Sequence, residues 1–339
     1  MSIEIAAREK KLLEPLDYER GYSLYVGIPF CPTTCLYCSF TSYPIEKWRG
    51  RTGLYLEALF KELEYTARKM EGRPLDTVYF GGGTPTSLPA EDLEALLSRL
   101  EQLFDLSRVL EFTVEAGRPD SITPDKLKVL RDHGITRISI NPQTMNQKTL
   151  DLIGRRHTVE DVREKFHLAR GLGFDNINMD LIVGLPEETL CDVKNTMEEI
   201  KALAPDSVTV HSLAIKRAAR LNMFKERYGN LKIENTQEMI DMTARYAEEM
   251  GMNPYYLYRQ KNMAGNFENV GYAAPGKECI YNILIMEEKQ TIMACGAGTT
   301  TKVLYPSENR IERAENVKEV EQYISRIDEM IGRKEKILA

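Results

Sequence analysis

The chain has 339 residues, of which 42% are hydrophobic and 28% charged, and its formal net charge is −6. This composition is typical of a globular enzyme with a sizeable core, and the acidic balance argues against nucleic acid or an anionic membrane as the main partner. No apolar run is long enough to span a bilayer, and the charged N-terminus lacks the apolar core of a signal peptide.

Strand and helix patterns alternate over the first two thirds of the chain. Six apolar stretches are predicted to be strands, at 22–28, 77–80, 109–116, 135–140, 176–183 and 207–213. The segments between them carry apolar residues at helical spacing, which predicts helices over 52–70, 89–104, 124–133, 159–171 and 189–203. Thr123 is the expected N-cap of the third helix, with Pro124 at its first position.

This alternation predicts an α/β fold with a parallel sheet and right-handed crossovers. Six β-α units are too few for a closed eight-unit barrel, so we expect a partial (β/α)6 barrel with a smaller C-terminal α+β segment. We expect a lead-in over 1–20, the barrel over 21–215, and a segment over 216–339 that covers the substrate. In that last segment the sequence predicts a charged helix near 235–250, strands at 279–287 and 291–295, and a helical, solvated tail over 315–339.

Three cysteines lie close together in a C-x3-C-x2-C arrangement: Cys31, Cys35 and Cys38. Three thiolates can hold a four-iron cluster and leave one iron open for a small molecule, because each iron takes one protein sulfur. This is the local signature of a radical S-adenosylmethionine enzyme. Clustered free thiols and a structural zinc site are alternatives, although zinc usually takes four ligands. The other three cysteines are scattered, which favours a reducing, cytoplasmic location.

A glycine run, Gly81-Gly-Gly-Thr-Pro-Thr86, follows the strand predicted at 77–80. Glycines allow the backbone to approach a ligand closely and expose amide donors, although such runs are also common as plain turns. About fifty residues after the cysteines, at the end of the next strand, this loop would suit the methionine end of S-adenosylmethionine.

Polar residues stand at the ends of the later strands, where ligand sites of parallel α/β proteins lie. Glu115 and Asp180 occur in otherwise apolar strands, and each could instead be a structural carboxylate with a basic partner. Arg155 or Arg156 could hold the cofactor's carboxylate in a bidentate pair, or could be solvated. The histidines His157 and His211 are interpreted as structural residues rather than acid–base catalysts.

With these motifs the chain resembles the oxygen-independent coproporphyrinogen III oxidase family of radical S-adenosylmethionine enzymes, from about residue 20 to residue 300. The resemblance rests on Tyr25–Cys31, Gly81–Thr86, Asn141–Gln143, Gly154–His157 and Asp180–Pro186. Within the family, residues 38–43 look most like the coproporphyrinogen dehydrogenase branch called HemZ. That branch usually carries an N-terminal extension that this sequence does not show, so we expect a short or truncated member.

The resemblance implies a [4Fe-4S] cluster on Cys31, Cys35 and Cys38, and S-adenosylmethionine bound to it. It implies contacts with that cofactor from Tyr25, Gly82 and Glu115. Further positions match those that contact a second S-adenosylmethionine in the founding enzyme: Tyr37, Gly83, Thr84, Gln143, Arg155, Asp180 and Ala214. The implied reaction converts propionates of coproporphyrinogen III to vinyl groups, giving protoporphyrinogen IX. A protein reductant such as flavodoxin or ferredoxin is the implied electron donor.

Two departures from the family pattern keep other functions open. Phe40 stands where the founding enzyme has a fourth cysteine, a pattern shared with heme-chaperone relatives, and Pro142 changes the usual Gly-Val-Gln motif. A heme-binding chaperone is therefore the main alternative, and a radical enzyme that modifies heme is another. If the substrate carries four propionates, Arg217, Arg220 and Arg259 are the cations expected to bind them.

Overall fold

The computed structural model describes residues 2–39, 42–216, 219–259 and 263–338. Within this part of the chain the main sheet has eleven strands, in the order β13-β12-β11-β1-β4-β5-β6-β7-β8-β10-β9, and β2 and β3 form a separate pair. Neighbouring strands from β11 to β8 are parallel, and the pairs at both ends of the sheet are antiparallel. The strands are β1 (Tyr22–Ile28), β2 (Phe30–Cys31), β3 (Tyr43–Pro44), β4 (Leu75–Gly82), β5 (Glu111–Gly117), β6 (Arg137–Ile140), β7 (Ile177–Val183), β8 (Ser207–Ser212), β9 (Asn253–Tyr258), β10 (Asn269–Ala273), β11 (Thr291–Cys295), β12 (Thr300–Tyr305) and β13 (Arg310–Glu315).

Helices follow the parallel strands in sequence. The α-helices are α1 (Ser2–Leu13), α2 (Thr52–Lys69), α3 (Ala90–Leu103), α4 (Pro124–Asp132), α5 (Gln147–Leu152), α6 (Val159–Gly171), α7 (Leu190–Leu203), α8 (Arg220–Met223), α9 (Lys225–Tyr228), α10 (Gln237–Glu249), α11 (Ile280–Met286), α12 (Val320–Ser325) and α13 (Ile327–Ile337). Short 3-10 turns are η1 (Ile45–Trp48), η2 (Pro85–Ser87), η3 (Pro119–Ser121), η4 (Ala264–Asn266) and η5 (Pro306–Glu308).

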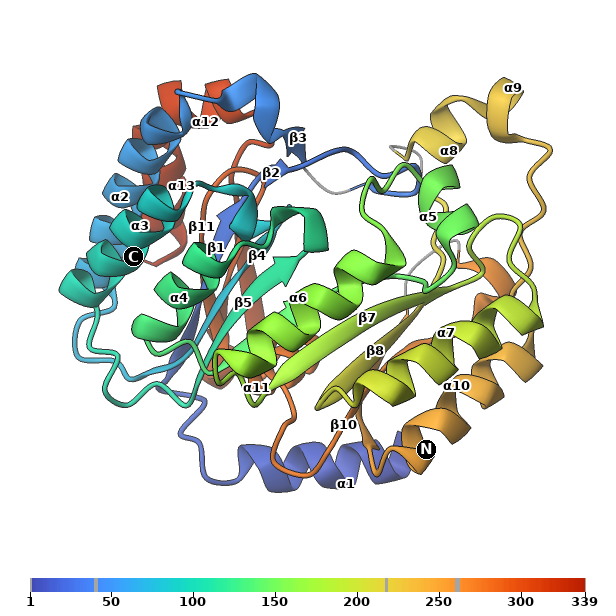
Figure 1. Cartoon of the computed structure of the whole chain (residues 1–339). Helices are drawn as coiled ribbons and strands as arrows, with labels where there is room; N and C mark the ends of the chain where they lie inside the picture. Colours follow the sequence, from blue (N-terminus) through green and yellow to red (C-terminus); the bar gives the residue numbers. More distant parts are fainter. Residues whose placement is uncertain (1, 40–41, 217–218, 260–262, 339) are drawn as a thin grey trace.

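The predicted (β/α)6 unit is confirmed in β1, β4, β5, β6, β7 and β8, with α2, α3, α4, α6 and α7 between them. These helices cover one face of the curved sheet, while β2 and the loop after it lie at the end of the molecule opposite α1 (Figure 1). On the inner face, α11 contacts β4 and β9, and its residues Asn282 and Met286 line the same cavity as the polar residues at the strand ends.

Local sequence explains the helix positions. Four leucines of α3, spaced as one helical stripe, are at most 1% exposed, and each fully buried leucine contributes about 1.5–3 kcal/mol to stability. The Thr123 hydroxyl accepts the Lys126 amide hydrogen at 3.3 Å, and Pro124 occupies the first position of α4. This N-cap is therefore confirmed as predicted.

The strand predicted at 279–287 is wrong, because this segment forms α11. Its apolar run does not distinguish a buried strand from a short helix. The deciding contact comes from Glu111 at the start of β5, whose carboxylate accepts the Ile280 amide hydrogen at 2.8 Å and the Cys279 thiol at 3.1 Å. A carboxylate placed at the first amides stabilises a helix N-terminus, and this contact is visible only in the fold.

Strands from residues 216–339 extend the barrel sheet at both ends, with β11 parallel to β1 and β10 antiparallel to β8. The proposed boundary after residue 215 remains a prediction. The tail is helical as predicted, but it is not solvated throughout, because Tyr323, Met330 and Lys334 are fully buried against the barrel. Among the described residues, no helix combines the length and apolarity needed to cross a membrane.

Candidate active site

The three clustered cysteines line one side of a cavity of about 370 Å³ at the inner face of the sheet. Cys31 ends β2, directly after β1, and both Cys31 and Cys35 are buried. Backbone hydrogen bonds fix the loop at Leu36, whose amide donates to the Ile153 carbonyl and whose carbonyl accepts from the Leu221 amide, both at 2.9 Å. The loop is thus held between α5 and α8, with its thiols facing the cavity.

This donor set fits an iron–sulfur cluster. Among the described residues, no three Cys, His, Asp or Glu side chains converge on a point that a single metal ion could occupy. The thiols instead share a cavity wall, which suits a cluster whose irons each take one thiolate. Burial raises the pKa of the Cys31 thiol to about 12, although the Thr84 hydroxyl 3.5 Å away favours the thiolate. Such a thiol stays protonated at neutral pH until iron displaces its proton.

The glycine loop is packed directly against the cysteine loop. The amides of Gly83 and Thr84 donate to the carbonyls of Ile28 and Phe30 at 2.8 and 2.7 Å. These two amides are therefore not the exposed donors that the sequence suggested. A side chain at Gly83 would place its Cβ 2.5 Å from the Phe30 oxygen. The glycine here allows two backbones to approach each other, and so positions Cys31 beside the loop.

Gly83→Ala is expected to separate these two backbones, lowering stability by about 1–3 kcal/mol and reducing the iron retained after reconstitution. The matched control is Gly171→Ala at the end of α6, where an added Cβ meets nothing within 4 Å. That variant should match or slightly exceed the parent in stability. Iron content and urea unfolding measure both effects. Parental iron content in Gly83→Ala would contradict this role of the loop.

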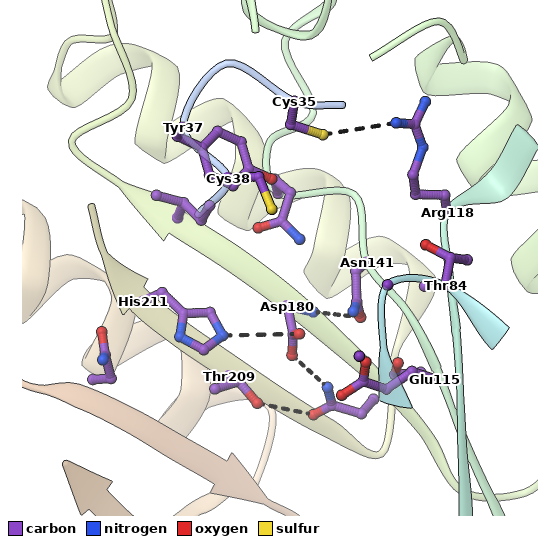
Figure 2. Close-up of a pocket in the computed structure, with 18 of the residues that line it drawn as sticks. Cys35, Tyr37, Cys38, Thr84, Glu115, Arg118, Asn141, Asp180, Thr209 and His211 are labelled. Carbon is purple, nitrogen blue, oxygen red and sulfur yellow. Dashed lines mark hydrogen bonds and ion pairs between the residues drawn. The ribbon is translucent and has the colours of Figure 1, made fainter. Parts of the chain in front are cut away.

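Two carboxylates in the cavity have pKa values displaced in opposite directions. Burial raises the pKa of Glu115 to about 7, although the Tyr79 hydroxyl donates to it at 2.7 Å. Burial also acts to raise the pKa of Asp180, but His211, 3.8 Å away, and the Asn178 amide, which donates at 2.7 Å, outweigh it and lower that pKa. Figure 2 shows the His211 imidazole directed at Asp180. At neutral pH Asp180 is thus a fixed anion, while Glu115 can take either form.

Replacing Glu115 by Gln should remove the loss of stability that the protein suffers as the pH rises from 4.5 to about 7. An unfolded carboxyl ionises near its ordinary pKa of 4.5, whereas folded Glu115 holds its proton up to about 7. Stability therefore falls as pH rises between these values and stays lower above them. At about pH 8, cluster-free Glu115→Gln should exceed the parent by on the order of 1–3 kcal/mol in urea unfolding, and the gain should vanish near pH 4. An equal gain at both pH values would contradict this origin.

Arg155 is a buried residue that lines the same cavity as Glu115 and Asp180. Its guanidinium donates to the Asn141 carbonyl and, at 3.4 Å, to the Tyr37 hydroxyl, while its Nε has no partner within the described structure. A buried guanidinium with a donor to spare is suited to a carboxylate ligand. Gln143 nearby adopts a left-handed backbone, φ 69°, which lets its amide and carbonyl bond to β7 through Asp180 and Ile182.

The structure brings every predicted cofactor residue to one cavity. Its lining includes the three cysteines together with Tyr25, Tyr37, Gly82, Gly83, Thr84, Glu115, Gln143, Arg155, Asp180 and Ala214. Their individual roles remain predictions. Neither Arg220 nor Arg259 is among the described lining residues, and Arg259 pairs with Glu268 at 3.3 Å. Phe40 and Arg217 lie outside the described residues.

Sequence reasoning missed several lining residues, among them Arg118, Arg137, Asn178 and Tyr256. Arg118 had a usable signal, because it directly follows Gly117 at the end of β5. The others lie within strands or come from the C-terminal segment, so only the fold places them at the cavity. Two further lining residues, Tyr25 and Tyr79, stack with the ring of Tyr281, and the ring centroids of Tyr79 and Tyr281 are 4.5 Å apart.

Residues 25–200 match the family model described as the radical SAM superfamily. The chain belongs to the radical SAM superfamily. A [4Fe-4S] cluster and S-adenosylmethionine are the cofactors that this membership implies, and the cavity supplies the three thiols that such a cluster needs.

Within the radical SAM superfamily, the chain is similar to three proteins of known name. The oxygen-independent coproporphyrinogen-III oxidase-like protein HemZ of Bacillus subtilis is 45% identical over 319 residues, covering 93% of this chain and 64% of HemZ. The heme chaperone HemW of the same organism is 33% identical over 281 residues, covering 81% of this chain and 69% of HemW. The structure of coproporphyrinogen III oxidase HemN from Escherichia coli covers 95% of this chain and 73% of HemN, with a TM-score of 0.72 and 23% identity.

These findings confirm the predicted resemblance to the oxygen-independent coproporphyrinogen III oxidase family, with HemZ sharing the highest identity of the three. The likeness to HemN confirms the fold class of this radical SAM chain. The chain spans slightly less than two thirds of the length of HemZ.

Proposed function

We propose that the protein is an oxygen-independent coproporphyrinogen III dehydrogenase, which converts propionate side chains of its substrate to vinyl groups and yields protoporphyrinogen IX. The observation that carries this proposal is the single cavity that joins three cluster cysteines to Glu115 and Asp180, in a chain 45% identical to HemZ. A cytoplasmic location and a reductant such as flavodoxin or ferredoxin belong to the same proposal.

The residues of the cavity have distinct parts in this scheme. When bound, the cluster and S-adenosylmethionine would supply a 5′-deoxyadenosyl radical able to take a hydrogen atom from the propionate carbon β to the ring. The vinyl group would then form as the propionate loses carbon dioxide and one further electron, which passes to an external electron acceptor. Arg155 would hold a carboxylate through its unpartnered Nε. Asp180, kept ionised by His211 and Asn178, would hold an ammonium group. The rings of Tyr25 and Tyr79, which line the cavity, would keep water from the reacting atoms.

The negative charges of the substrate's propionates need basic side chains at the cavity, and Lys216 is one of its lining residues. The exposed Arg220 lies four residues further along the chain, at the start of α8. Binding of propionates by Arg220 and Arg259 remains a prediction. Arg220→Ala should weaken substrate binding and leave the slow cleavage of S-adenosylmethionine without substrate unchanged, because the residue does not line the cofactor cavity.

The proposal is tested by incubating the reconstituted protein anaerobically with coproporphyrinogen III, a reductant and S-adenosylmethionine. Chromatography should detect protoporphyrinogen IX, with 5′-deoxyadenosine formed in proportion. A Cys38→Ala preparation is the control for activity without the cluster. Cleavage of S-adenosylmethionine with no decarboxylated product would refute the substrate and leave the class of chemistry standing.

Heme delivery is the second candidate, and the 33% identity to the heme chaperone HemW favours it. The cavity also presents His211, an imidazole that could ligate heme iron, beside the Tyr258 hydroxyl at 3.3 Å. Stoichiometric heme binding that is lost in His211→Ala, without substrate-dependent 5′-deoxyadenosine, would replace the enzyme proposal by this one. A radical enzyme that modifies heme would instead yield 5′-deoxyadenosine with heme as the substrate.

A further inference from the structure

A buried arginine lies beside the cluster cysteines and was not foreseen as part of the site. Arg118 follows β5, its side chain is only 3% exposed, and it lines the same cavity as the cysteines. Its Nη1 donates to the Cys35 sulfur at 3.7 Å and to the carbonyl and hydroxyl of Thr33, two residues before Cys35, at 3.0 and 2.7 Å. Figure 2 shows the guanidinium facing the Cys35 thiol.

The remaining donors of Arg118 are held by one carboxylate. Its Nε and Nη2 donate to the two oxygens of Asp120 at 2.9 and 2.7 Å, a bidentate pair. Asp120 is positioned by the 3-10 turn Pro119–Ser121 and lies 3.9 Å from the Nδ1 of buried His157. All three guanidinium nitrogens therefore have acceptors within the chain. This distinguishes Arg118 from Arg155, whose Nε has no described partner.

A buried guanidinium whose three nitrogens all have acceptors is poorly suited to binding a ligand but well suited to acting on the sulfur beside it. A hydrogen bond to a cluster sulfur and a nearby positive charge both stabilise the reduced cluster, which carries one negative charge more than the oxidised cluster. Because both groups are buried, solvent screens this charge weakly. The Asp120 carboxylate opposes the effect, since it lies on the far side of the same guanidinium.

We propose that Arg118 raises the reduction potential of the cluster through Cys35, and that Asp120 positions it and moderates its charge. In this arrangement Arg118 is a positioning and electrostatic residue, while the electron still comes from the external reductant. The inference rests on the cluster and not on the proposed substrate. A measurement made without any tetrapyrrole therefore tests it separately from the proposed function.

The test is a redox titration of the reconstituted full chain, monitored by the electron paramagnetic resonance signal of the reduced cluster. Arg118→Gln removes the positive charge and should shift the midpoint to a more negative potential. Asp120→Asn removes the opposing charge and should shift it to a less negative potential. Arg118→Lys keeps the charge and should fall between the parent and Arg118→Gln. The control is Arg163→Gln, because Arg163 pairs with Glu160 and Glu199 on the helical surface and should leave the midpoint unchanged.

Midpoints of Arg118→Gln and Asp120→Asn that both equal the parent's, or that move in the same direction, would overturn the proposal. If Arg118→Gln fails to hold iron, the midpoint potential of Asp120→Asn is the deciding measurement, because that variant retains Arg118. An unchanged or more negative midpoint in that variant would then refute the electrostatic role and leave Arg118 as a purely structural residue.

Discussion

Replacing any one of Cys31, Cys35 and Cys38 by Ala is expected to abolish the broad visible absorbance of the reconstituted cluster and most of its iron. Two thiolates cannot hold the cluster with the affinity of three, because one iron more is left without a protein sulfur. The three thiols line a single cavity, so the remaining cysteines of the chain cannot replace the one removed. Absorbance and iron content, measured on anaerobically reconstituted protein, check the result.

The other cysteines are the controls. Cys191 is exposed on α7, Cys279 donates to Glu111, and Cys295 lies 3.4 Å from the Thr66 hydroxyl on the far side of the sheet from the cavity lining. Cys191→Ala should keep the full cluster signal. A requirement for Cys279 or Cys295 in cluster binding would show that the three-ligand interpretation is wrong.

Lys334→Met is expected to destabilise the protein by about 3–5 kcal/mol, the range found when one partner of a buried ion pair is removed. Lys334 and Glu62 form an ion pair in which both side chains are fully buried, joining α13 to α2. Glu62 also accepts from the Asn316 side chain and the Gly296 amide, each at 2.7 Å. Without Lys334 its carboxylate would remain buried with its charge uncompensated. Urea unfolding of the cluster-free protein measures the loss.

A matched control on the same helix is Glu329→Gln, since Glu329 pairs with Arg326 and Arg333 at the surface. Exposed pairs of this kind contribute little to stability, so this variant should unfold close to the parent. The double variant Glu62→Gln with Lys334→Met should recover part of the stability, because no buried charge is then left alone. Equal losses in Lys334→Met and Glu329→Gln would contradict the proposed role of the buried pair.

The barrel was predictable because its signals are local. Apolar strands alternate with amphipathic helices from β1 to β8, and Thr123-Pro124 marks a helix start by chemistry that needs no tertiary partner. The cofactor cavity was predictable for a related reason, since its cysteines, glycines and carboxylates stand at consecutive strand ends. A parallel sheet necessarily gathers these ends along one edge.

What was missed depends on contacts between distant residues. Glu111 makes residues 280–286 a helix by binding its first amides across 169 positions of sequence. Lys334 forms a buried ion pair with Glu62, although the many charged residues of the C-terminal tail predict that the tail is exposed to solvent. Arg118 stands at the end of a predicted strand, but its contacts with Thr33 and Cys35 are visible only in the fold. None of these pairings leaves a pattern that periodicity or spacing can detect.

The transfer of one hydrogen atom from substrate to cofactor tests the proposed reaction most directly. Coproporphyrinogen III deuterated on the propionate carbons β to the ring is incubated with the reconstituted protein, reductant and S-adenosylmethionine, and the 5′-deoxyadenosine is analysed by mass spectrometry. The proposed reaction predicts that deuterium appears in 5′-deoxyadenosine together with protoporphyrinogen IX. Unlabelled 5′-deoxyadenosine, formed at the same rate with and without the substrate, would contradict it.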